Sequence, residues 1–159
     1  KSQDSSKKGS FEVLDFARWV NVVALTEDDE FIMIRQYRHG NDDLTWEIAG
    51  GACERGEKSL FSAQRELREE TGYISNNWIY LGMNHPNPAF MTNECYFYLA
   101  KNCRYEGELQ LDELEEIEVV KWSRAEINER LKNGDITHAL VTAAFLYFKL
   151  YESENSFLI

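Results

Sequence analysis

The sequence predicts a single α+β domain in which a mixed β-sheet is packed between helices. First, short stretches rich in Val, Ile, Phe and Tyr, typical of strands, dominate the first two thirds of the chain. Second, one helical pattern interrupts these stretches and two more close the chain, as expected for strands and helices packed in layers. Third, 159 residues with 43% hydrophobic content suit one core, since domains mostly contain about 100–150 residues.

Small and polar residues begin the chain. We expect residues 1–10 to be a flexible tail and residues 11–159 to form the domain. The strands expected in that domain are apolar or alternating runs separated by turn residues such as Asp28 and Asp29. They cover residues 11–13, 19–25, 31–34, 44–48, 74–83, 94–100 and 119–122.

The first helix is predicted over residues 58–71. Leu60, Ala63 and Leu67 fall on one apolar stripe, and Gly72 follows as a C-terminal stop. The stripe is expected to face the sheet, which leaves the opposite side of the helix to its charged residues.

Two further helices are predicted after the last strand. Ser123 and Glu126 have the spacing of a capping box, so a helix should begin there. Asp135 is expected to cap the final helix, over residues 136–152.

The chain is strongly acidic, with 17 Lys and Arg against 28 Asp and Glu, a formal net charge of −11. This argues against nucleic-acid binding, because phosphate contacts need clustered Lys and Arg. An acidic protein that acts on phosphates needs another source of positive charge, and a divalent metal ion is the obvious candidate.

The cysteines and the apolar stretches indicate the compartment. The chain has 3 cysteines without Cys-x-x-Cys spacing and 3 scattered histidines, which gives no sign of a disulfide framework or a zinc site. Residues 136–151 form the most apolar stretch, which is shorter than the ~20 apolar residues of a membrane span. With no signal peptide apparent, we expect a cytoplasmic protein that does not bind membranes.

Three glutamates gather on one face of the first helix. Glu66, Glu69 and Glu70 are related by i,i+3 and i,i+4 spacing, so their carboxylates repel one another unless a cation compensates. Mg²⁺ does so well, because it takes oxygen ligands and is held by one or two carboxylates together with substrate phosphates. The carbonyl of Gly50 is a further candidate ligand, and Arg65 is placed to orient Glu57 or Glu66. The alternative interpretation is a charged helix face in contact with solvent.

The segment from residue 51 to residue 73 resembles the Nudix box, Gly-x5-Glu-x7-Arg-Glu-U-x-Glu-Glu-x-Gly-U, in which U is a bulky apolar residue. Nine specified positions over 23 residues match, which makes a chance match very improbable. The matching residues are Gly51, Glu57, Arg65, Glu66, Leu67, Glu69, Glu70, Gly72 and Tyr73.

The resemblance implies the Nudix fold, a mixed sheet in an α/β/α sandwich, over residues 11–152. It also implies hydrolysis of a nucleoside diphosphate linked to another moiety, with two or more Mg²⁺ or Mn²⁺ ions bridging the diphosphate. Carried over to this chain, the catalytic and metal-binding residues are Glu66, Glu69 and Glu70 with the Gly50 carbonyl. Glu57 and Arg65 are then expected to hold the loop and the helix together behind the ligands.

Outside the box, the run Ile-Arg-Gln-Tyr-Arg at residues 34–38 and the run Trp-Glu-Ile-Ala-Gly-Gly at residues 46–51 are similar to the ADP-ribose and nucleotide-sugar pyrophosphatase branch. Ala49 stands where that branch usually has proline. By matching position, the resemblance makes four residues candidates for substrate binding, although ion pairing with the acidic surface is the alternative for the two arginines. They are Arg35, Arg38, Trp46 and Glu47.

The loop at residues 85–93 adds two weaker candidates for substrate binding. Pro88 lies 16 residues after Gly72, where ADP-ribose-type enzymes have a proline, although the proline also suits an ordinary turn. Phe90 either stacks on a base or packs within the protein. Members of the branch are commonly homodimers, for which residues 18–25 and the apolar last helix offer an interface. A last helix buried within one chain is the alternative.

A second acidic cluster occupies residues 106–118, with seven acids and no Lys or Arg. In the enzymes that this chain resembles, a mobile loop at this position delivers a catalytic glutamate to the metals. Glu113 and Glu115 fit best and Glu116 next, and the residues alone do not choose among them. A charged edge that discourages aggregation is the alternative.

The sequence therefore predicts a Mg²⁺- or Mn²⁺-dependent hydrolase that splits ADP-ribose or a related nucleoside diphosphate sugar into a nucleoside monophosphate and a sugar phosphate. Two alternatives within the family act on nucleoside triphosphates or diadenosine polyphosphates. A cap hydrolase is disfavoured because no basic stripe is present. A sensor that binds a nucleotide sugar without cleaving it is disfavoured because no glutamate of the box is missing.

Overall fold

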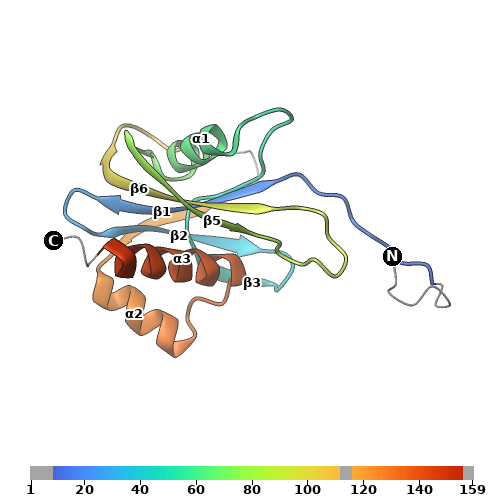
Figure 1. Ribbon diagram of the computed structural model, residues 1–159. Coiled ribbons are helices and arrows are strands. Elements are labelled where there is room, and N and C mark those ends of the chain that lie inside the picture. Colours follow the sequence, from blue (N-terminus) through green and yellow to red (C-terminus); the bar gives the residue numbers. More distant parts are fainter. Residues whose placement is uncertain (1–8, 112–115, 156–159) are drawn as a thin grey trace.

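The computed structural model describes residues 9–111 and 116–155, and contains a mixed sheet with helices on both of its faces (Figure 1). This confirms the predicted α+β class. The strands are β1 (Trp19–Thr26), β2 (Phe31–Arg38), β3 (Asp43–Glu47), β4 (Tyr73–Ile74), β5 (Asn77–Asn84), β6 (Cys95–Tyr105) and β7 (Ile117–Trp122). The helices are α1 (Ser59–Thr71), α2 (Arg124–Asn133) and α3 (Ala139–Asn155).

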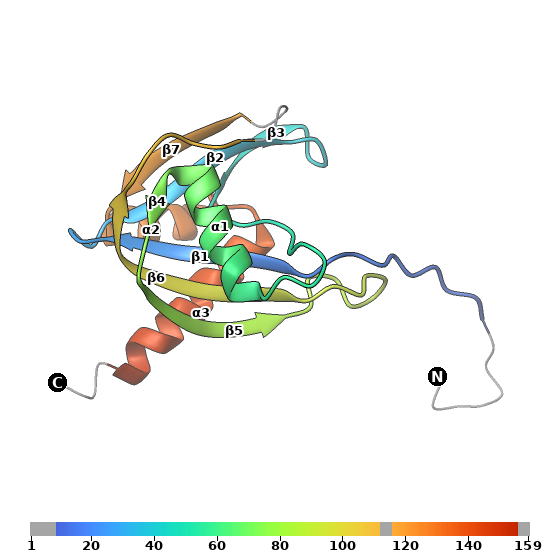
Figure 2. The same cartoon turned by 90° about the horizontal axis from the view of Figure 1, so that it is seen from above.

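The sheet has the order β3-β2-β1-β6-β4, with β5 also paired to β6 and β7 to β2. The pairing of β1 with β6 is parallel, and the other pairings between strands are antiparallel. Figure 2, seen from above, shows α1 crossing over one face, with α3 below the sheet. The sheet thus separates two apolar layers.

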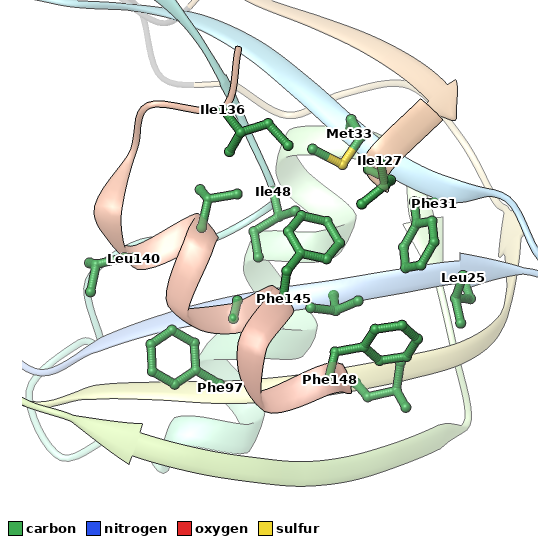
Figure 3. Packing of buried hydrophobic residues seen from close by; sticks show 14 of the residues in the cluster. Leu25, Phe31, Met33, Ile48, Phe97, Ile127, Ile136, Leu140, Phe145 and Phe148 are labelled. Atoms are coloured by element: carbon green, nitrogen blue, oxygen red, sulfur yellow. The ribbon is translucent and has the colours of Figure 1, made fainter. Parts of the chain in front are cut away.

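Alternation along β1 supplies both layers, because successive side chains of a strand point to opposite faces. Val20 and Val22 pack on the side of α1, together with Ala63 and Leu67 of that helix. Val23 faces the other way, into the layer beneath α3. Figure 3 shows that second layer, in which Phe145 and Phe148 lie among side chains from several strands.

Two local predictions were wrong, and a third is not tested. Residues 11–13 form no strand, because this exposed segment has no neighbour to pair with until Leu14 bridges to Met91. The strand predicted at residues 74–83 is divided into β4 and β5 at Ser75, whose hydroxyl accepts the N–H of Asn77 at 2.9 Å. The tail predicted for residues 1–10 lies outside the described residues except for residues 9 and 10.

The start of the last helix also differs from the prediction. The backbone N–H of Asp135 bonds to the carbonyl of Arg130 at 2.9 Å, so Asp135 closes α2 instead of capping α3. His138 takes the capping place, because its Nδ1 accepts the N–H of Leu140 at 3.3 Å. The predicted capping box at Ser123 is present.

The segment between β3 and α1 positions the candidate site. It runs along β1, where the N–H of Val22 bonds to the carbonyl of Ala49 at 2.8 Å and the N–H of Val20 to that of Gly51 at 2.9 Å. The glycine pair is therefore held against the sheet at the edge of α1. None of the helices in the described part of the chain is long and apolar enough to cross a membrane.

Candidate active site

A cavity of about 460 Å³ lies where the glycine segment, α1 and the start of α3 meet. Strands β1, β2 and β3 also contribute to its wall. It is lined by Trp19, Asn21, Arg38, Glu47, Gly50, Gly51, Ala52, Glu54, Arg65, Glu66, Glu69, Glu70, Gln110 and His138. Half of the predicted site residues, seven of fourteen, thus share one cavity with several residues that were not predicted.

The structure brings together Glu66, Glu69 and Glu70, as their helical spacing requires. Nη1 of Arg65 lies 2.8 Å from Oε1 of Glu66 and 3.0 Å from Oε2 of Glu69. Glu70 is only 4% exposed, and its Oε2 accepts the backbone N–H of Gly50 at 2.8 Å. Glu66 and Glu69 therefore share the guanidinium of Arg65, and the cavity wall, with five glutamates and two arginines, retains an excess of negative charge.

The two glycines give these carboxylates room. A Cβ added to Gly51 would lie 2.5 Å from Oε1 of Glu66, so a side chain there would occupy the place of that carboxylate. A Cβ on Gly50 would lie 2.3 Å from the backbone oxygen of Val20, which leaves no room for any side chain. Glycine is therefore required at residue 50, where the loop approaches the backbone of β1, whereas a side chain at residue 51 would displace the carboxylate of Glu66.

Glu57 and Arg65 tie the glycine loop to α1. Glu57 accepts the hydroxyl of Ser62 at 2.6 Å and the backbone N–H of Glu54 at 3.0 Å, and its Oε2 lies 3.3 Å from Nη2 of Arg65. Nη2 of Arg65 also donates to the carbonyl of Ala52 at 3.1 Å. Burial tends to raise the pKa of Glu57, but the hydrogen bonds from Ser62 and Arg65 outweigh it and lower this pKa to about 2. Burial tends to lower the pKa of Arg65, but its acidic partners raise it.

Arg38 and Glu47 form a second charged pair in the wall. Nε and Nη2 of Arg38 donate to the two carboxylate oxygens of Glu47, each at 2.7 Å, in a forked pair. Glu47 is 2% exposed, and burial tends to raise its pKa, but the bonds from Arg38 and Thr45 lower it overall. Nε2 of His138 lies 3.9 Å from Oε2 of Glu47.

The structure does not bring Arg35 and Trp46 into this cavity. They are partners across β2 and β3, and strand alternation turns both away from the side that Arg38 and Glu47 occupy. The guanidinium of Arg35 lies 5.0 Å from the ring centroid of Trp46 and 3.8 Å from Glu118. The ion pair proposed as the alternative for the arginines is thus what Arg35 forms.

The predicted residues of the loop at 85–93 also lie away from the cavity. Pro88 and Phe90 are both exposed, and neither lines it. The carbonyl of Phe90 accepts the N–H of Leu14 at 2.8 Å, so this loop contacts the segment that leads into β1.

The second acidic cluster is described only in part. Glu113 and Glu115 lie outside the described residues, and Glu116 is exposed. The beginning of the cluster is held at the C-terminal end of α1, where the N–H of Glu106 bonds to the carbonyl of Gly72 at 2.9 Å and that of Gln110 to Glu69 at 2.8 Å. The segment therefore leaves from the edge of the cavity.

The wall residues that were missed include Asn21, Trp19 and His138. Asn21 is a polar residue within a run of valines, and that interruption was the signal that was available for it. The sequence contains no comparable indication of a site for Trp19 or His138. Trp19 is one of several apolar residues of a predicted strand, and His138 is an isolated histidine. All three reach the cavity only through the fold.

The cavity fits a hard divalent cation. Its donors are carboxylate oxygens, with the carbonyl of Gly50, which accepts no hydrogen bond within the described part of the chain. Among residues 9–111 and 116–155, no three acidic, His or Cys side chains converge on one point by themselves. Arg65 forms ion pairs with Glu66 and Glu69. A metal ion at these carboxylates therefore needs additional oxygen ligands, which substrate phosphates supply to Mg²⁺.

Comparisons with known proteins agree with this architecture. Residues 15–145 match the family model described as NUDIX domain. The chain is 27% identical over 150 residues to an ADP-ribose pyrophosphatase of Bacillus subtilis, and the match covers 94% of this chain and 81% of that protein. It is 30% identical over 135 residues to a methanol dehydrogenase activator of Bacillus methanolicus, covering 84% of this chain and 73% of that protein. A crystal structure of an ADP compounds hydrolase has the same fold, with a TM-score of 0.78 at 24% identity over 87% of this chain and 74% of that one.

Proposed function

Because the chain belongs to the Nudix hydrolase family, whose chemistry is the cleavage of pyrophosphate bonds, we propose that it splits ADP-ribose or a related nucleoside diphosphate sugar. The products are a nucleoside monophosphate and a sugar phosphate. The observation that carries the proposal is the meeting, in one cavity, of the glutamates of α1 with the forked pair of Arg38 and Glu47. The names of two relatives, an ADP-ribose pyrophosphatase and an ADP compounds hydrolase, support the substrate class.

Glu66, Glu69, Glu70 and the Gly50 carbonyl would hold the metal, Mg²⁺ or Mn²⁺, with Glu113 or Glu115 as the acid that the second cluster supplies. Such ions neutralise the diphosphate, lower the pKa of a bound water and stabilise the charge that develops at phosphorus. The residues of the chain set up this chemistry. Glu57 and Arg65 hold the loop against α1, which keeps the carboxylates and the Gly50 carbonyl on the same side of the cavity.

Arg38 and Glu47 are the residues of the cavity wall that we assign to substrate binding. Their forked pair leaves the side chain of Arg38 37% exposed, so Arg38 presents positive charge to an incoming nucleotide while it pairs with Glu47. His138 adjoins the same pair and extends this surface. The charge distribution suits a molecule that carries anionic phosphates at one end and neutral hydroxyls at the other.

The proposal is tested with purified protein and a panel of ADP-ribose, other nucleotide sugars, nucleoside triphosphates and diadenosine polyphosphates, with product identification by mass spectrometry. We expect a nucleoside monophosphate from ADP-ribose or a nucleotide sugar in Mg²⁺ or Mn²⁺, and no product after EDTA treatment. Pyrophosphate released from triphosphates would instead support the triphosphate alternative. Tight binding without turnover, measured by calorimetry, would support the sensor.

We also propose that the active form is a homodimer. The segment that leads into β1 runs out from the body of the molecule (Figure 2), and it exposes Phe11 by 89%, Val13 by 59% and Phe16 by 50%. Apolar side chains in such a segment are buried at low cost against a second copy. Light scattering of the purified protein is expected to give twice the mass of the chain, and a mass equal to one chain would refute the dimer.

A further inference from the structure

Asn21 is a polar residue in the middle of the apolar strand β1, and its side chain lies in the wall of the cavity beside Gly50. Its neighbours Val20 and Val22 are 0% exposed, and Asn21 itself is 6% exposed. A Cβ on Gly50 would lie 2.9 Å from Nδ2 of Asn21, so the carboxamide occupies the space over that glycine. Glu70 accepts the N–H of the same glycine, so Gly50 is in contact with both Asn21 and Glu70.

Cys95 contacts the oxygen end of this carboxamide. Its Sγ donates to Oδ1 of Asn21 at 3.2 Å. Cys95 is 0% exposed, and burial raises the pKa of its thiol to about 12, so the thiol stays protonated and remains a donor at neutral pH. A thiol that donates must face the amide oxygen, which turns Nδ2 to the other side. The opposite orientation would direct the partial negative charge of Oδ1 toward the glutamates.

The amino group of Asn21 is left for a molecule that enters the cavity. Within residues 9–111 and 116–155, Nδ2 donates no hydrogen bond to the protein. A side-chain donor that lines a cavity and bonds to no protein group is available to a ligand or to a water molecule. Neutral charge suits this position, because a guanidinium or ammonium there would pair with the glutamates and compete with a metal ion.

We propose that Asn21 is a substrate-binding residue that donates from Nδ2 to a phosphate oxygen of the nucleoside diphosphate, and that Cys95 is the positioning residue that orients it. This inference rests on the proposed function. The phosphate is favoured over the sugar or the base because Asn21 adjoins Gly50, whose carbonyl we assign to the metal.

The first test replaces Asn21 with alanine and, separately, with the isosteric aspartate. Each variant is expected to lower kcat/KM by about 10- to 100-fold, the loss expected for one hydrogen bond to a charged group. Each should also weaken the binding of α,β-methylene ADP in Mg²⁺ by a similar factor in calorimetry. Wild-type kcat/KM and wild-type affinity in either folded variant would overturn the inference. Absence of turnover in the wild-type protein would refute the proposed function, while the calorimetry still tests Asn21.

The second test separates positioning by Cys95 from a structural role. We expect Cys95→Ala to lower kcat/KM about three- to tenfold and Cys95→Ser to restore it, because the hydroxyl also donates to Oδ1. Cys103 is the matched control, since it lies on the same strand, is 3% exposed and donates to the carbonyl of Ala100 at 3.5 Å, away from the cavity. An equal loss of kcat/KM in Cys103→Ala, or no rescue by Cys95→Ser, would refute the role of Cys95.

Discussion

Replacement of Glu70 with glutamine is expected to lower kcat by about 10³-fold or more while the fold stays intact, because metal catalysis contributes several kcal/mol to the barrier. The substitution removes one negative charge and keeps the shape of the side chain. Glutamine still offers an oxygen to the N–H of Gly50, with which Glu70 bonds at 2.8 Å, so the loop should keep its place. The measurement is turnover of the best substrate of the panel in saturating Mg²⁺, together with the thermal unfolding midpoint.

Glu129→Gln is the matched control for this variant. Glu129 is exposed on α2 and does not line the cavity, so the same change of charge should leave kcat unchanged there. Calorimetry with Mn²⁺ adds a readout besides activity, since Glu70→Gln should bind the ion more weakly than the wild-type protein does. Normal turnover in Glu70→Gln would refute the assignment of this carboxylate to the metal.

Replacement of Arg38 with alanine is expected to lower the free energy of unfolding by about 3 kcal/mol at pH 7, because it leaves the buried carboxylate of Glu47 without its charged partner. This is the lower end of the range for a broken buried pair, and it is appropriate because Arg38 is 37% exposed whereas Glu47 is 3% exposed. Chemical denaturation at a series of pH values measures it.

The dependence on pH identifies the cause. In the wild-type protein the pKa of Glu47 is lowered relative to its value in the unfolded chain. The contribution of Glu47 to the free energy of unfolding is therefore complete above the unfolded pKa and is lost as the pH falls through the folded pKa. In Arg38→Ala, burial dominates and raises this pKa above the unfolded value. The difference in the free energy of unfolding between Arg38→Ala and the wild-type protein should therefore be largest at pH 7 and become smaller toward pH 4.

A double variant completes this cycle. Arg38→Ala combined with Glu47→Gln should regain most of the lost stability, because no charge remains buried. A loss in the double variant as large as in Arg38→Ala would show that packing, not the unpaired carboxylate, accounts for the effect.

Much of the fold and part of the candidate site were predictable because their signals are local. Glu66, Glu69 and Glu70 lie on one face of α1 because a helix brings residues three and four apart together, whatever surrounds it. Gly72 ends α1 in the left-handed conformation, with φ of 73°, as its place after the apolar stripe predicted. The spacing from Gly51 to Glu57 and Arg65 likewise describes one continuous loop and helix.

Other elements were mispredicted because their signals compete. Asp135 is a good helix cap by residue type, yet Gly134 ends α2 immediately before it. The N–H of Asp135 consequently bonds to the carbonyl of Arg130 at the end of α2. The alternating residues 11–13 have the pattern of a strand, but a strand requires a neighbour, and the described chain offers none there.

The sequence by itself therefore determined the family, the α+β class and the glutamate face of α1, since these follow from spacing along a single segment. Only the tertiary structure decided what meets that face. Strand pairing placed Arg38 with Glu47 in the cavity and turned Arg35 with Trp46 away from it, because a shift of one residue reverses the face on which a strand side chain lies. Asn21 from β1 and His138 before α3 reach the same wall from opposite ends of the chain. Proximity of this kind depends on how the sheet and helices pack, which residue spacing does not encode.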